Sequence, residues 1–240
     1  MSRLQQKALV VLTVLGMSAT GAVSAEEKYF LLLFASQADP VAPRTSHTFA
    51  TFVKATGNGA DMKKWKIETR TISWMPIGRS VMPRFARERG QNFDLVATLA
   101  WTKSQSARMS LWGPFEVDRE LHESAERQIE RLESGVLPYH LLNGGLRPAS
   151  GLNCMHAVSD LAPGERLASG IAYGEAGSAA VLRHLRRWIP NPQPTHDWLI
   201  ERLELKEQNL QRRQWKREAQ HYGKEDCNNL AHVAGEKVAR

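Results

Sequence analysis

The stretch Lys28–Ala35 reads Lys-Tyr-Phe-Leu-Leu-Leu-Phe-Ala and is a continuous apolar run of strand length. Asp39-Pro40 and Pro43 follow it closely, and such residues mark the end of a regular element. A short apolar run without polar interruptions is typical of a strand that lies inside a sheet rather than at its border. We therefore predict that this segment is a central strand and that the fold is built around it.

Two further segments downstream have the character of strands. Residues 46–55 alternate around Phe49 and Val53 and end at the Gly-Asn-Gly turn of residues 57–59. Residues 66–74 form a third candidate strand. We expect these two segments to pair in antiparallel fashion through a long connection.

The middle of the chain contains one clear helix signal. Asp118 is a suitable N-cap, and the apolar residues from Leu121 to Leu132 recur on one face at helical spacing before Gly135 ends the run. Residues 95–101 fit either a strand or a helix. The sequence Trp-Gly-Pro-Phe at 112–115 is interpreted as a turn.

The last third of the chain is predicted to be mainly helical. A short helix is expected within residues 150–161, another over 179–188, and a long final helix from Thr195 to Trp215, with a predicted short strand before them at 137–142. These patterns together predict an α+β fold in which an antiparallel sheet packs against helices. We assign residues 26–222 to a single globular domain and residues 223–240 to a flexible tail.

The first 25 residues have the order of a secretory signal peptide. Arg3 and Lys7 precede an apolar run over residues 8–17, and small residues lead to Val23-Ser24-Ala25. We predict cleavage after Ala25 and release into the periplasm or the medium. The alternative, an uncleaved anchor, is disfavoured because a bilayer span needs about 20 apolar residues. No later stretch is long and apolar enough to be a transmembrane segment of the mature chain.

The composition is that of an ordinary globular protein, with 42% hydrophobic and 24% charged residues and a net charge of +7. Residues 183–240 hold twelve Lys or Arg against eight Asp or Glu. Such a surface could attract an anionic polymer, but charges of both signs alternate along it, which favours a solvated face. Phosphate-loop and dinucleotide motifs are absent, so we expect no nucleotide partner and predict no cofactor.

The most informative stretch for chemistry is Asn153-Cys154-Met155-His156, at the predicted start of a short helix. A thiolate there would be stabilised by the helix dipole and by free backbone N–H groups, which would lower its pKa and make it a nucleophile. A nucleophile also needs a base. His47 is the best candidate, because strand alternation places it on the same face as Phe49 and Val53.

These two segments resemble the permuted branch of the papain-like superfamily, the group of NlpC-like and lecithin retinol acyltransferase-like cysteine hydrolases. The resemblance rests on Ser46-His47-Thr48-Phe49 and on the Asn-Cys-Met-His sequence at 153–156. It implies that Cys154 is the nucleophile and His47 the general base of an exported thiol hydrolase or acyltransferase. The implied bonds are amides or esters, with cell-wall peptide as the expected periplasmic substrate. No third catalytic residue stands out on the next strand.

Other interpretations of these residues remain open. Cys154 could be a small core residue, or it could form a disulfide with Cys227, the second cysteine of the chain. A metal site built from His47, Cys154 and His156 has poor zinc spacing, so we predict no metal. The main alternative function is a non-catalytic periplasmic protein that binds a polymer or a partner through its basic C-terminal helix.

Overall fold

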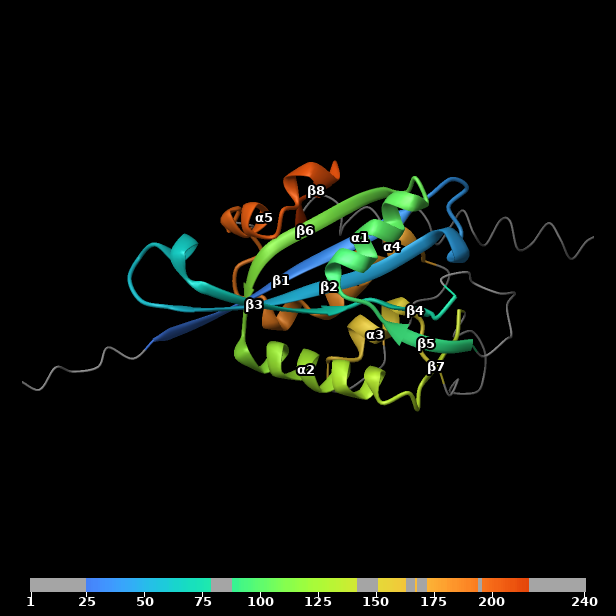
Figure 1. The fold of residues 1–240 in the computed structure, drawn as a ribbon, viewed down its shortest axis with the longest axis horizontal. Helices are drawn as coiled ribbons and strands as arrows, with labels where there is room; N and C mark the ends of the chain where they lie inside the picture. Colours follow the sequence, from blue (N-terminus) through green and yellow to red (C-terminus); the bar gives the residue numbers. More distant parts are fainter. Residues whose placement is uncertain are drawn as a thin grey trace, which may run out of the picture.

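The computed structural model describes residues 25–78, 88–141, 151–162, 167, 172–193 and 196–215. Within these ranges the chain forms an α+β fold with one five-stranded sheet, one three-stranded sheet and helices that pack against them (Figure 1). The predicted signal peptide up to Ser24, the predicted tail and Cys227 lie outside the described residues. None of the helices in these ranges has the length and apolar character needed to cross a membrane.

The large sheet has the strand order β3-β2-β1-β6-β8. All neighbours pair antiparallel except β6 and β8, which are parallel. The strands are β1 (Glu26–Gln37), β2 (Ser46–Gly57), β3 (Lys66–Ile72), β6 (Arg108–Val117) and β8 (Gln211–Arg213). The apolar run that begins at Lys28 is thus the central strand, as predicted, and β2 and β3 form the predicted antiparallel pair.

The central strand is apolar throughout because both of its faces are covered. Leu31, Leu33 and Ala35 belong to one hydrophobic cluster, whereas Phe30 and Phe34 belong to the other. Successive side chains of a strand point to opposite faces, so a strand between two helical layers needs no polar side.

Different helices cover the two faces of the sheet. We call one the α2–α4 face, because α2 (Arg119–Glu133), α3 (Cys154–Ser159) and α4 (Gly174–His184) contribute to its cluster. The other is the α1–α5 face, covered by α1 (Leu95–Ser104) and α5 (Trp198–Arg202). The described ranges also hold short 3-10 helices at Pro43–Thr45, Met62–Lys64, Arg186–Trp188 and Lys206–Gln208.

A small second sheet lies at the end of the large one, with the order β4-β5-β7. Its strands are β4 (Trp74–Pro76), β5 (Glu88–Asn92) and β7 (Pro138–Tyr139). The third predicted strand therefore divides at Ser73, and its last residues enter this sheet. Gly90 is required in β5 because a Cβ atom there would collide with the buried indole ring of Trp74.

Side-chain caps explain where α1 and α3 begin. Residues 95–101, which the sequence left open, belong to α1, and the Asp94 carboxylate accepts the Ala97 N–H at 2.7 Å. Helix α2 also begins after Asp118 as predicted, but the Asp118 side chain makes no capping hydrogen bond. Helix α3 follows Asn153, whose side-chain oxygen accepts the His156 N–H at 2.9 Å. Side-chain acceptors of this kind satisfy the free N–H groups of a first helical turn.

Two local predictions are wrong. Residues 112–115 are not a turn but part of β6, where the register with β1 shifts between Leu31 and Leu33. Trp112 and Phe115 are both buried, so the segment stays in the sheet. The Gly-Pro pair between them is accommodated as an irregularity of the strand. Gly113 has a φ of 90° and lies against the Leu31 carbonyl oxygen.

The long helix predicted over residues 195–215 is also absent. Its place is taken by α5, a 3-10 helix and β8, with left-handed φ angles at Glu204 and Asn209. The physical reason is tertiary contact: Leu205 is buried between these elements, and Arg213 donates to the carboxylate of Glu175 at 2.7 Å. A continuous helix could not make both contacts and pair β8 with β6. The helix predicted over 179–188 is α4 followed by a 3-10 turn.

Candidate functional site

His47, the predicted base, lies near the start of β2 and points to the α1–α5 face. Its ring stacks on Phe49 with centroids 5.5 Å apart, and the Trp101 ring of α1 meets it edge-on at 5.6 Å. Its Nε2 atom lies 2.9 Å from the hydroxyl oxygen of Ser73. Phe49 belongs to the cluster of this face, so the alternation predicted from the sequence is correct for His47.

Cys154, the predicted nucleophile, opens α3 on the opposite face. Its side chain belongs to the cluster of the α2–α4 face, and backbone N–H groups of Thr48 and Met155 are directed at its sulfur. The side chain of Thr48, one residue after His47, points to this face and its hydroxyl lies 2.8 Å from that of Ser178 in α4. The side chains of Cys154 and His47 thus pack with the clusters of opposite faces and form no hydrogen bond with each other, although the Cys154 sulfur accepts from the residue next to His47.

Burial is the main cause of the pKa shifts of both Cys154 and His47. Burial raises the pKa of the Cys154 thiol, and the nearby backbone N–H groups offset this effect only in part. The predicted lowering of the Cys154 pKa is therefore wrong. Helix α3 has only six residues, and Asn153 already occupies the His156 N–H of its first turn. Burial also lowers the pKa of His47 to about 3, so its imidazole is neutral at physiological pH.

His156 packs inside the protein as part of α3. Its Nδ1 lies 2.8 Å from the side-chain oxygen of Asn153, and its Nε2 lies 3.0 Å from the carbonyl oxygen of Leu167. These contacts fix the ring in place. No group of three or more His, Cys, Asp or Glu residues suited to a metal ion occurs in the described part of the chain.

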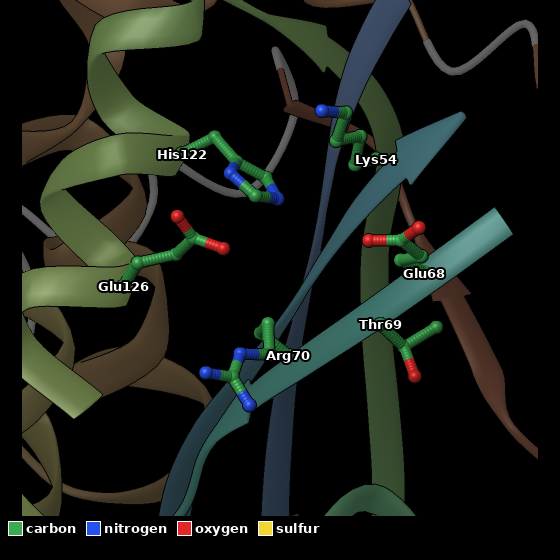
Figure 2. Close-up of a pocket in the computed structure, with 6 residues that line it drawn as sticks. All are labelled: Lys54, Glu68, Thr69, Arg70, His122 and Glu126. Carbon is green, nitrogen blue, oxygen red and sulfur yellow. The ribbon is translucent and has the colours of Figure 1, made fainter. Parts of the chain in front are cut away.

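A different set of polar side chains surrounds a hollow of about 460 Å³ between α2 and the strands β2 and β3 (Figure 2). Lys54 and Glu68 are direct neighbours across the β2–β3 pair, and Arg70 is two residues further along β3. His122 and Glu126 are four residues apart in α2, so they lie on the same side of that helix. The hollow is lined by Lys54, Glu68, Thr69, Arg70, His122 and Glu126.

Two of the four charges in this hollow are already paired. Lys54 contacts Glu27 at 2.6 Å, and Glu68 contacts Lys66 at 2.6 Å. Arg70 and Glu126, in contrast, form no ion pair and no hydrogen bond within the described part of the chain. A cation and an anion thus border the same hollow, and no described protein group uses their hydrogen-bonding capacity.

The third unused group is the imidazole of His122. Its ring points into the hollow (Figure 2), and its Nε2 is buried without a hydrogen-bond partner among the residues that the structure describes. The ring contacts Tyr29 with centroids 4.9 Å apart. Burial lowers the pKa of His122, which favours the neutral ring. A neutral imidazole offers Nε2 as a donor or as an acceptor, depending on its tautomer.

Arg70, Glu126 and His122 are suited to binding a ligand through hydrogen bonds. The planar guanidinium of Arg70 suits a carboxylate, which it can bind through two parallel hydrogen bonds. The Glu126 carboxylate accepts from an amine or a hydroxyl, and His122 can bond to either kind of group. Thr69 brings the only hydroxyl among the lining residues, and its side chain points away from α2 (Figure 2).

Sequence reasoning missed this hollow. A signal was present, since His122 and Glu126 are polar residues four apart beside the apolar stripe of the predicted helix. The strand residues Lys54 and Arg70 gave no sign that they would face that helix. Comparisons of the chain with protein families, with curated proteins and with solved structures found no match.

Proposed function

We propose that this protein is an exported, non-catalytic binding protein and that the hollow between α2 and β3 is its ligand site. The observation that carries the proposal is the buried Nε2 of His122, which has no partner among the described residues and points into the hollow beside Arg70 and Glu126. A buried polar atom without a hydrogen bond costs about 1–3 kcal/mol. A ligand that supplies the missing bond explains why the chain carries a histidine at this position.

A catalytic role finds less support. A thiol nucleophile and its base need to lie within hydrogen-bond reach of each other. Cys154 and His47 lie on opposite faces of the sheet, and burial raises the pKa of the thiol. The thiol hydrolase and the permuted papain-like fold implied by the resemblance remain predictions.

The lining residues also define the chemistry of the ligand. The hollow holds two cations and two anions, so it does not select for net charge. Arg70 and Glu126 instead favour a molecule that carries a carboxylate and an amine or hydroxyl close together. Cell-wall peptide has free carboxylates and amines, and an exported protein would meet it. We therefore propose cell-wall peptide or a similar zwitterionic peptide as the ligand class.

Titration of the purified protein with the dipeptide alanyl-glutamate tests the site. With histidine ¹⁵N-labelled, we expect the ring resonances of His122 to shift and those of His47 to stay constant. Arg70→Gln should weaken the response about tenfold, the loss of about 1.4 kcal/mol expected for one charge-assisted hydrogen bond. Lys64→Gln is the matched control, because Lys64 is an exposed cation that pairs with Asp61 and does not line the hollow.

Two results would contradict the proposal. One is a His122 resonance that does not move up to about 10 mM dipeptide, since a Kd of 1 mM already corresponds to only about 4 kcal/mol. The other is a shift that is equally large in the Arg70→Gln variant and in the wild-type protein.

A further inference from the structure

We infer that the outer edge of β3 takes the ligand as an added β-strand, so that the partner is an extended peptide with an acidic side chain that reaches Arg70 and His122. This inference rests on the proposed function, because it uses the same hollow. It adds a main-chain binding mode, in which backbone hydrogen bonds give affinity and the hollow gives specificity.

Strand β3 is an edge of the large sheet, where it pairs only with β2 among the described strands. The direction of its backbone groups can be followed at its C-terminal end. The carbonyl of Thr71 accepts the Asn92 side-chain amide at 2.9 Å, and the Ser73 N–H donates to the same side chain at 2.8 Å. Both groups therefore face away from β2. Because backbone groups alternate along an antiparallel strand, those of Ile67 and Thr69 also face outward.

Asn92 limits the length of this free edge. Its side chain occupies the backbone of Thr71 and Ser73, and the Phe93 N–H donates to the Ser73 carbonyl at 3.0 Å. The edge left for a partner is residues 66–70. This length suits a peptide segment of about five residues, which is the common length of a strand.

The hollow lies directly beside this edge. Glu68 and Arg70 point toward α2, whereas the Thr69 side chain points the other way (Figure 2). Thr69 nevertheless borders the hollow, so we infer that its main chain does so, at the outer edge. A strand added there would lie about 4.8 Å from β3, and every second side chain would stand beside Glu68 and Arg70.

Charge complementarity then specifies the partner. An antiparallel peptide would place one residue opposite Arg70 and, two positions later, one opposite Glu68. An acidic residue at the first position and a basic residue at the second match both charges, and the acidic group is the one that reaches toward His122. Like charges directly opposite one another on paired strands are destabilising, so the reversed pattern is disfavoured.

The charges of residues 66–70 also disfavour a second copy of this chain as the strand that pairs with this edge. If residues 66–70 paired in full with their own copy, Glu68 would face Glu68 and Lys66 would face Arg70. Both contacts are repulsive, and charged residues on edge strands commonly prevent such self-association. The edge is thus closed to its own copy and open to a strand of complementary charge.

The test uses the capped peptide acetyl-Thr-Glu-Thr-Lys-Thr-amide and the purified protein. We expect it to shift the His122 ring resonances and to bind at least about tenfold more tightly than alanyl-glutamate, because each added backbone hydrogen bond contributes about 1 kcal/mol. Thr69→Pro should lower the affinity for the capped peptide about tenfold. Proline removes an outward N–H and leaves the bonds to β2 in place. Thr69→Val, which keeps the N–H, should bind like the wild-type protein.

A second measurement protects the test if Thr69→Pro does not fold. The same peptide N-methylated at its central threonine loses a backbone donor and should bind the wild-type protein about tenfold more weakly. Equal binding of the methylated and parent peptides would overturn the edge-strand inference.

The remaining outcomes separate this inference from the proposed function. If Arg70→Gln still weakened the binding of alanyl-glutamate in that case, the proposed function would stand. If neither ligand moved the His122 resonances, both would be wrong. A dimer that competes with the peptide would make a second copy the occupant and also overturn the inference.

Discussion

The Nε2 atom of His47 lies 2.9 Å from the hydroxyl oxygen of Ser73, and both side chains are buried in the α1–α5 face of the sheet. Phe49 and Trp101 enclose the rest of the imidazole. A charged ring in this position would lose its hydration without gaining a counter-ion, because no cause other than burial acts on its pKa. His47 is therefore a neutral packing residue whose protonation is linked to unfolding.

Acid should destabilise the protein through this histidine. The folded-state pKa of His47 is about 3, below the ordinary value of 6.5, so the unfolded state takes up the proton first. Its stabilising contribution is complete above pH 6.5 and is lost as the pH falls toward 3. Denaturant unfolding between pH 7 and pH 4.5 should show a loss of a few kcal/mol, since each pKa unit corresponds to about 1.4 kcal/mol. His47→Gln should flatten this slope, whereas Ser73→Ala should keep it.

His122→Leu should stabilise the protein while it removes the ligand response. The Nε2 atom of His122 is buried without a partner among the described residues, so an apolar replacement removes a polar atom that costs about 1–3 kcal/mol. We expect the free energy of unfolding to rise by about 1 kcal/mol. Gln128→Leu is the control in the same helix. Gln128 is also buried but donates to the Ala157 carbonyl at 3.1 Å, so its loss should destabilise by about 1 kcal/mol. A large destabilisation by His122→Leu would indicate a structural histidine.

The thiol of Cys154 should be inert in the folded protein. It is buried, and burial raises its pKa, so little thiolate is present at neutral pH. We expect iodoacetamide at pH 8 to label Cys154 only after denaturant is added. Rapid labelling of the folded protein at pH 6 that slows in His47→Ala would contradict this placement and support the thiol hydrolase.

Gly90→Ala should be strongly destabilising. A Cβ atom at Gly90 would overlap the ring of Trp74, which is buried and whose indole N–H donates to the Leu152 carbonyl at 3.1 Å. Overpacking of this kind typically costs about 1–3 kcal/mol. Gly78→Ala is the matched control, because no described residue other than its chain neighbours lies within 4 Å of its added methyl group. The two midpoints of urea unfolding should differ clearly, and equal midpoints would show that the Trp74 ring can move.

Glu175 should be essential for the attachment of β8. Its carboxylate accepts from the Ser110 hydroxyl at 2.7 Å and from Arg213 at 2.7 Å, and it is almost fully buried. Glu175→Ala leaves the buried Ser110 hydroxyl without its acceptor and Arg213 without this carboxylate partner, so we expect a loss of about 1–3 kcal/mol. Limited proteolysis should then cut near β8 at lower protease concentration. Glu201→Ala, which breaks only the exposed pair with Lys206, should change neither stability nor cleavage.

Elements with a local pattern could be predicted from the order of their residues. The apolar run from Lys28 specifies the central strand, the alternation of residues 46–55 specifies β2 and the direction of His47, and Asp118 marks the start of α2. Each of these features depends on the order of neighbouring residues. Strand alternation and helical spacing follow from the geometry of the backbone alone, so they can be predicted without knowledge of the fold.

The face of the sheet that each helix covers depends on long-range packing. Helix α3 packs on the side of Thr48 rather than that of His47, and this choice separates Cys154 from the predicted base. The hollow likewise exists only because α2 lies over the end of β2 and β3. Long-range contacts also explain why the long helix predicted over residues 195–215 does not form. Leu205 is buried and Arg213 binds Glu175, and a continuous helix could not make both contacts. Such choices depend on which apolar surfaces fit together across the whole chain, and no local periodicity contains that information.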